Sequence, residues 1–130
     1  MALMSFREPN QVKWVGMRPA HRGTQVIVRA GGLGAEFIVY TVPAGKTFYL
    51  CGLLVGFSTT AVATWGTVRV RNDLDVVQYA LAGLLMDAVG QNIVAHSYWP
   101  PLEIPALWDV TVLSSAVTLE CMVAINGWVE

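Results

Sequence analysis

Charged residues are scarce in this sequence. They make up 13% of its 130 residues, whereas hydrophobic residues make up 55%. An ordinary soluble domain carries about 25% charged residues. A chain with so few charges and a positive mean hydropathy is too apolar for a free monomer with an ordinary wet surface. We therefore expect the surplus apolar surface to face a partner protein or a membrane.

The sequence also lacks a long apolar run. A membrane-spanning helix needs about 18 or more consecutive apolar residues. The best candidate, residues 48–57, is about half that length and contains Gly52 and Gly56. The first residues, MALMSFREPN, lack the basic start, apolar middle and cleavage site of a secretion signal. The sequence therefore predicts a protein made in the cytoplasm, with no membrane partner, that is built into an oligomer or a larger shell.

Cysteine and histidine are scarce as well, with two residues of each. Cys51 and Cys121 lie in expected strands and are predicted to act as small buried hydrophobes. A disulfide between them would require facing strands, which leaves their pairing open. His21 and His96 are far apart, and neither a CxxC pair nor a GxSxG motif is present. We expect no metal, no cofactor, no catalytic residue and no enzyme activity.

The charges are distributed unevenly along the chain. Residues 1–31 contain five basic residues and one acid, a balance of +4, whereas residues 32–130 contain three basic residues and eight acids, a balance of −5. A basic leading segment on an acidic body suits exchange of an arm between copies, or docking on another acidic protein. The basic residues are sparse and accompany no nucleic-acid motif, so nucleic acid is not an expected partner.

The rest of the chain alternates between strand patterns and turn residues. Alternation places Val68 and Val70 on the opposite side from Arg69 and Arg71, and it separates Val110 and Val112 from Asp109 and Thr111 in the same way. Gly31–Gly34 is expected to be a turn, and Pro100–Pro101 is expected to end a strand. Leu84–Val89 fits either a helical turn or a loop. Strands are expected at 24–30, 36–42, 46–57, 65–71, 76–82, 92–99, 108–113 and 117–125.

This spacing predicts an all-β fold with two antiparallel layers. The leading architecture is an antiparallel β-sandwich, an eight-stranded jelly roll with an N-terminal arm, and an immunoglobulin-like sandwich is second. The arm would span residues 1–23 and the sandwich domain residues 24–130. Paired acids in the turn at Asp73 and Asp75 lack a calcium-loop pattern, so a solvated turn is the preferred interpretation.

The expected strand 46–57 is apolar on both faces. Simple alternation sends Phe48, Leu50 and Leu54 one way and Tyr49, Cys51, Leu53 and Val55 the other. A strand coated on both sides has to be covered on both sides, which predicts an assembly interface on the body of the protein. The interface residues expected in the body are Phe48, Tyr49, Leu53, Val55 and Phe57, and those expected in the arm are Arg7, Lys13, Trp14, Met17, Arg18 and Arg22.

Aromatic residues offer a different interpretation. Such residues can form a platform on which sugar rings stack, as in lectin-like sandwiches. The expected loops, however, contain few clustered Asn, Asp and Gln residues to bind hydroxyl groups. A carbohydrate- or receptor-binding module is therefore the alternative function. Its candidate aromatics are Trp65, Tyr79, Tyr98, Trp99 and Trp108.

Three segments resemble a known family. YTVPAGKTFYLCGLLVGF resembles the opening hairpin of small jelly-roll virion proteins of tailed bacteriophages, in which a VPAGK-aromatic turn precedes a long apolar strand. PPLEIPALWDVTVLSS is similar to the segment in which a proline-rich bend precedes a strand, and CMVAINGWVE is similar to the endings of these proteins. The resemblance covers about residues 35–130. The chain departs from it at Leu107, where many of these proteins have glycine.

The resemblance implies a non-enzymatic phage structural protein located in the virion. The expected role is that of a capsid decoration, or cement, protein that forms a homo-oligomer, expected to be a trimer, and stabilises the shell. Its expected partners are other copies of itself and the major capsid protein or another virion protein. The alternative, a carbohydrate- or receptor-binding module, would belong to a phage fibre or tail.

Overall fold

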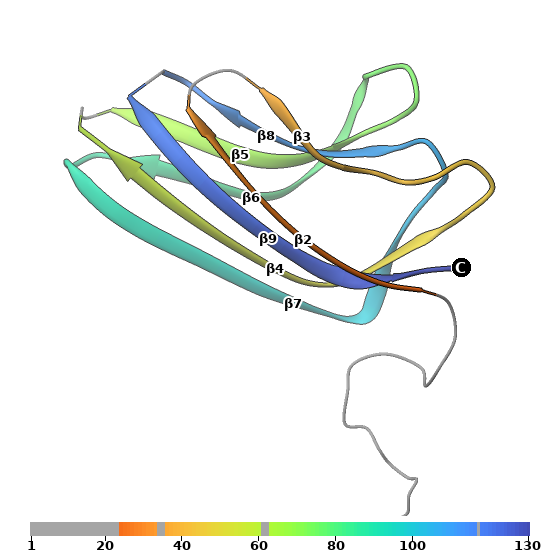
Figure 1. Ribbon diagram of the computed structural model, residues 1–130. Helices are drawn as coiled ribbons and strands as arrows, with labels where there is room; N and C mark the ends of the chain where they lie inside the picture. The colour runs from red at the N-terminus through yellow and green to blue at the C-terminus, as the bar shows by residue number, and fades with distance from the viewer. Residues whose placement is uncertain (1–23, 34–35, 61–62, 117) are drawn as a thin grey trace, which may run out of the picture.

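The protein is built from strands in the part of the chain that the structure describes. The structure is a computed structural model, and it describes residues 24–33, 36–60, 63–116 and 118–130. Two antiparallel sheets pack against each other (Figure 1). The predicted antiparallel β-sandwich is therefore confirmed. The strands are β2 (Thr24–Leu33), β3 (Phe37–Thr41), β4 (Phe48–Thr59), β5 (Thr64–Arg71), β6 (Val77–Met86), β7 (Gly90–Ile104), β8 (Asp109–Ser114) and β9 (Leu119–Val129).

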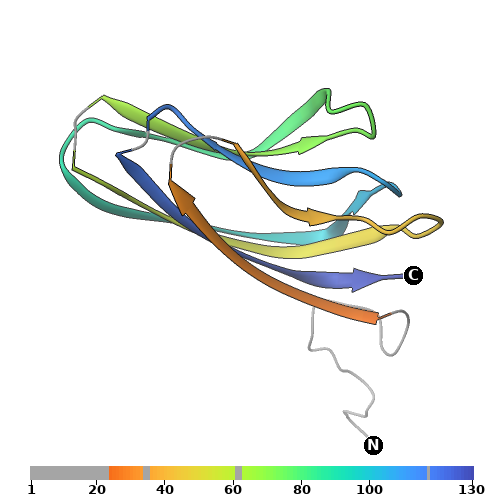
Figure 2. The same cartoon turned by 45° about the horizontal axis from the view of Figure 1, so that its top comes forward.

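Each sheet has four strands. The first sheet has the order β2-β9-β4-β7, and the second has the order β3-β8-β5-β6. The pairs are nested: β5 pairs with β6, β4 with β7, β3 with β8, and β2 with β9. Successive pairs lie alternately in the second and the first sheet, so one long hairpin winds through both layers (Figure 2).

The core lies between the two layers and follows the predicted alternation. Val68 and Val70 of β5 and Val110 and Val112 of β8 are fully buried from the second sheet. From β9, alternate residues from Leu119 onward are buried, whereas Glu120 between them is exposed. The largest side chains buried in this core are Phe48, Phe57, Leu50, Ile104, Leu119 and Ile125, whereas Trp128, which is also buried, stacks on Tyr49.

A register shift in β4 changes which apolar residues lie on each face of this strand. The pairing of β4 with both neighbours shifts between Leu50 and Gly52. After a bulge of this kind, each later residue of the strand faces the side of the sheet opposite to the one that simple alternation predicts. Leu53 and Val55 therefore share the core with Phe48 and Leu50, and all four are buried. Leu54 is placed on the outer face, where it is 50% exposed.

Two predicted strand ends were wrong. The strand β7 continues past Pro100 and Pro101 to Ile104. It is an edge strand, and its pairing with β4 jumps from Leu102 to Ser97, so the two prolines fall where no ladder partner is required. Gly31, Gly32 and Leu33, which were expected in a turn, instead belong to β2, and Leu33 pairs with Glu120 of the long strand β9.

The segment Leu84–Val89, whose structure the sequence left open, is divided between a strand and a connection. Its first three residues, Leu84–Met86, complete β6. The next three residues lie between β6 and β7. Met86 is 5% exposed and belongs to the core, so packing between the sheets extends the strand to this point.

Close packing between the layers depends on a small residue at Gly66. This residue of β5 faces the ring of Phe57, which crosses from β4 in the other sheet. A Cβ atom at position 66 would overlap that ring, whereas a Cβ atom at Gly83 of β6 would lie an ordinary 3.5 Å from Cγ2 of Thr67. The two glycines therefore form a matched pair for testing the packing.

We expect Gly66→Ala to lower the free energy of unfolding by about 1–3 kcal/mol, because the added methyl group overpacks the core. Gly83→Ala, which has room for its methyl group, should leave stability unchanged or raise it slightly. Urea denaturation followed by tryptophan fluorescence measures both. Equal effects of the two substitutions would show that Phe57 does not pack against Gly66.

Candidate functional site

The outer face of the first sheet carries exposed apolar side chains at its centre. Leu54 of β4 lies opposite Ala95 of β7 and Ala124 of β9, and in the next outward row Gly56 lies opposite Ile93 and Met122. Leu54, Ile93 and Met122 are 50%, 68% and 66% exposed. We call this surface the apolar face and define it by Leu54, Gly56, Ile93, Ala95, Met122 and Ala124.

The apolar face is hollowed because small residues stand between the large ones. Gly56 and Ala124 lie low between the longer side chains of Leu54, Ile93 and Met122. Together with Val123 they line a shallow depression of about 270 Å³. A second depression continues from Ile93 and Met122 to the polar end of the strands, where its lining includes Ser58, Gln91 and Glu120. Such a hollow suits a protruding apolar side chain.

Acidic residues lie beyond both ends of the apolar face. Glu120 of β9 is exposed two residues from Met122 and lines the second depression. At the opposite end, Tyr49 pairs with both Glu103 and Trp128, and its ring stacks on Trp128 with centroids 4.9 Å apart. Burial, together with the negative charges of Glu103 and Glu130, raises the pKa of the Tyr49 hydroxyl. The described charged side chains of this face are therefore carboxylates at its two ends, and along the neighbouring strand β2 the backbone of Arg29 pairs with that of Ala124.

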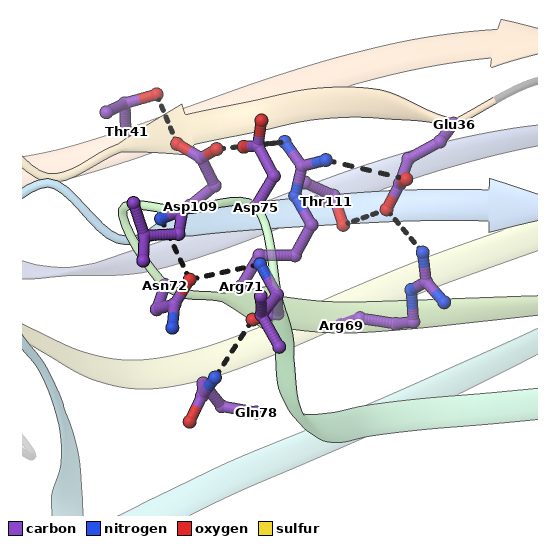
Figure 3. A network of polar contacts seen from close by, with 11 residues as sticks. Glu36, Thr41, Arg69, Arg71, Asn72, Asp75, Gln78, Asp109 and Thr111 are labelled. Carbon is purple, nitrogen blue, oxygen red and sulfur yellow. Dashed lines mark hydrogen bonds and ion pairs between the residues drawn. The ribbon is translucent and has the colours of Figure 1, made fainter.

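The outer face of the second sheet is covered differently. An ion-pair network extends over β8 from β5 and from the residue that precedes β3 (Figure 3). The Arg69 guanidinium donates to Glu36 Oε2 at 2.7 Å, and Thr111 Oγ1 donates to the same oxygen at 2.8 Å. Arg71 donates to Asp109 Oδ2 at 2.9 Å. Asp109 also accepts from Thr41 at 2.7 Å, and Asp75 lies 3.2 Å from Arg71.

This network buries the polar side of β8. Thr111 is fully buried and Asp109 is 7% exposed, although alternation directs both away from the core. Burial alone would raise the pKa of Glu36, but hydrogen bonds from Arg69 and Thr111 and the charges of Arg69 and Arg71 outweigh burial and lower this pKa. The charged network thus covers β8 on the second sheet, where Trp65 and Leu85 form an exposed apolar pair outside the network, whereas the centre of the first sheet has no charged cover among the described side chains.

The interface residues predicted for the body are placed mainly in the core, which corrects that prediction. Phe48, Leu53, Val55 and Phe57 are at most 3% exposed, so another copy cannot contact them directly. Tyr49 is half-buried against Trp128. The physical reason is the bulge of β4, which gathers both apolar sets on the inner side of the strand.

The exposed residues that the sequence interpretation missed follow the outward phase of neighbouring strands. Leu54, Ile93 and Met122 alternate along their strands with residues that face the core. Each therefore occupies a position that faces outward from the sheet. A large apolar residue at an outward position was the available signal. Recognising these positions as outward requires the pairing register of β4 with β7 and β9, which cannot be read from the sequence.

The interface residues predicted for the arm lie outside the described residues. Arg7, Lys13, Trp14, Met17, Arg18 and Arg22 all fall within residues 1–23. Their role in assembly stays a prediction.

The aromatic platform proposed as an alternative is divided between different parts of the fold. Trp65 of β5 and Trp99 of β7 are exposed, but they belong to different sheets. Tyr79, Tyr98 and Trp108 pack against the core. The structure therefore does not bring these five residues together on one surface. Carbohydrate binding by a smaller set stays a prediction.

The remaining chemically reactive residues are dispersed. Cys51 and Cys121 are buried, as predicted, and the Sγ atom of Cys51 lies 3.9 Å from the carbonyl oxygen of Tyr49. The side chain of Asn72 accepts hydrogen bonds from the backbone N–H groups of Leu74 and Val76, which closes the turn that contains Asp73. The described residues include no group of three or more His, Cys, Asp and Glu side chains placed to hold a metal ion. No helix in the described residues has the length and hydropathy to cross a membrane.

The lowered pKa of Glu36 predicts a loss of stability in acid. Its carboxylate stabilises the folded state above its usual value of 4.5, and this contribution is lost as the pH falls through the lowered folded pKa. Glu36→Gln should lower the free energy of unfolding at neutral pH by about 1–2 kcal/mol, because its hydrogen bonds to Arg69 and Thr111 lose their charge. This deficit should shrink toward zero in acid.

Denaturant titrations from neutral pH to below pH 4.5 measure this difference. Asp73→Asn is the matched control, since it removes one carboxylate from an exposed position in the turn. It should change the free energy of unfolding at neutral pH much less than Glu36→Gln does, because it breaks none of the hydrogen bonds of the network. A deficit of Glu36→Gln that stays constant at every pH would contradict the role given to this carboxylate.

No protein-family model and no curated protein matches the chain.

Proposed function

We propose that this chain is a non-enzymatic virion structural protein, a capsid decoration protein of a tailed bacteriophage that forms a homo-oligomer and stabilises the shell. The observation that carries the proposal is the apolar face, a hollowed and exposed hydrophobic surface at the centre of a sheet. Exposed apolar patches framed by polar residues are typical of protein–protein interaction sites. The resemblance of residues 35–130 to small phage virion proteins supports the type of assembly.

The jelly-roll topology belongs to the same proposal. The nested pairing of β5 with β6, β4 with β7, β3 with β8 and β2 with β9 supports it, as does the alternation of these pairs between the two sheets. A double-sheet sandwich of eight strands is the usual form of this architecture in capsid proteins.

The energy available from the apolar face indicates what kind of assembly it can support. Fully burying a Leu, Ile or Met side chain contributes about 1.5–3 kcal/mol, so the exposed parts of Leu54, Ile93 and Met122 together represent about 3–5 kcal/mol. A micromolar complex requires about 8 kcal/mol. The apolar face therefore needs further contacts, which several copies joined in one oligomer or bound to one shell would supply.

The expected oligomer is a trimer, so light scattering of the full chain should give three times the 14.1 kDa chain mass over a wide concentration range. Ile93→Asp should shift the mass toward the monomer, because it places a charge in the apolar face. Leu85→Asp is the control, since Leu85 is 64% exposed on the second sheet. A wild-type protein that is monomeric at every concentration, or equal effects of the two substitutions, would contradict assembly through the apolar face.

The location in the virion is tested separately. We expect this chain in many copies per particle in density-purified phage particles from the strain that carries its coding sequence. Quantitative mass spectrometry of the particles measures the copy number relative to the major capsid protein. Absence of the chain from particles that contain all other structural proteins would contradict a virion role, whatever its oligomeric state.

A further inference from the structure

The charge pattern around the apolar face limits what can bind there. The hollow lined by Leu54, Ile93 and Met122 suits apolar side chains, and the carboxylates of Glu120 at one end and Glu103 at the other suit cations. The chemistry of the surface therefore fits a peptide segment with an apolar centre and a basic residue on each side. This inference rests on the function proposed above, because it names the segment that binds when copies assemble.

Direct stacking of two apolar faces fits the charges poorly. If the strands of the two copies ran in opposite directions, Glu120 of each copy would approach the end marked by Glu103 and Glu130 in the other. If the strands ran in the same direction, Glu120 would approach Glu120. Carboxylate faces carboxylate in both arrangements, and juxtaposed like charges disfavour an interface.

The chain itself contains a segment with the required composition. Residues 13–18 read KWVGMR, so Trp14, Val15 and Met17 lie between Lys13 and Arg18. Tryptophan is enriched among the residues that dominate binding energy, and methionine adapts to irregular apolar hollows. We propose that residues 13–18 of one copy bind in the apolar face of a neighbouring copy, with Lys13 and Arg18 directed toward the acidic ends.

The connecting chain is long enough to reach the apolar face, and the homo-oligomer proposed above supplies a neighbouring copy for it to bind. Thr24 pairs with Val129 at the Tyr49 end of the sheet, whereas Met122 pairs with Gly31, seven residues further along β2. That distance is about 23 Å along a strand. Met17 also stands seven residues before Thr24, so only a fully extended connection after a complete reversal at Thr24 would place Met17 on Met122 of its own copy. Trp14 stands ten residues before Thr24 and would reach its own face without full extension, so the cross-linking of mixed chains decides between the two copies. The connection contains Pro19 and Gly23, which favour turns.

Cysteine cross-linking in the full-length protein tests the exchange directly. One sample of the chain carries Met17→Cys, and a second, distinguished by a size tag, carries Met122→Cys. After mixing and mild oxidation we expect a disulfide between the two differently tagged chains. The control replaces Met122→Cys by Leu85→Cys, an equally exposed position on the second sheet, and this pair should cross-link at least about tenfold less. Cys51 and Cys121 are buried, and the unmodified chain corrects for any reaction that they give.

Charge reversal provides a second readout that does not depend on cysteine chemistry. The double variant Lys13→Glu/Arg18→Glu should weaken assembly measured by light scattering by about tenfold or more in concentration midpoint. Combining it with Glu103→Lys/Glu120→Lys should restore the midpoint to within a few-fold of the wild type. Far-ultraviolet circular dichroism verifies that each variant is folded. Additive effects with no restoration would overturn the proposed pairing of charges.

The outcomes separate this inference from the proposed function. A further chain carries both Met17→Cys and Met122→Cys. A stable oligomer in which this chain cross-links within itself, while the mixed single-substitution chains do not cross-link, would show that the segment binds its own copy, and the inference would be wrong. An oligomer with equal cross-linking to positions 122 and 85 would also overturn the inference while leaving assembly intact. A wild-type chain that stays monomeric would overturn the assembly function itself.

Discussion

The arrangement of this protein depends on the register shift in β4 between Leu50 and Gly52. The strand is paired on both sides, with β9 and with β7, so each of its residues must point either into the space between the sheets or away from it. Without the shift, Phe48 and Leu50 would fill the core while Leu53 and Val55 faced outward. With the shift, all four are buried, and the outward row that remains is Leu54 and Gly56. One local irregularity thus builds the core and leaves the apolar face exposed.

The outward side chains of the two sheets are covered in different ways. On the second sheet, the side chains of Arg69 and Arg71 cross the strand β8 and bury Thr111 under ion pairs with Glu36 and Asp109. These contacts are made within one chain and stabilise its own fold. On the first sheet, small residues and exposed Leu54, Ile93 and Met122 form a hollow between acidic ends, which favours contact with another chain. The difference in cover is why we assign assembly to the first sheet.

Much of the fold was predictable because alternation is a local property. Val68, Val70, Val110 and Val112 were assigned to the core from their spacing, and the structure buries all four. The end of β7 was not predictable in this way. Pro100 and Pro101 are excluded from a central ladder but tolerated at a register break on an edge strand, and the position of β7 at the edge follows from pairing with a strand about forty residues earlier in the chain.

The sequence by itself determined the all-β class, the layered architecture and the excess of apolar surface, because these follow from composition and from the two-residue repeat of extended chains. Tertiary structure alone decided which apolar residues stay exposed. Phe57 and Met122 are similar in hydrophobicity, yet Phe57 crosses to Gly66 in the opposite sheet whereas Met122 lies outside beside Ile93. The reason is physical: a single-residue shift in pairing exchanges the two faces of a strand, and that shift is set by neighbours distant in sequence.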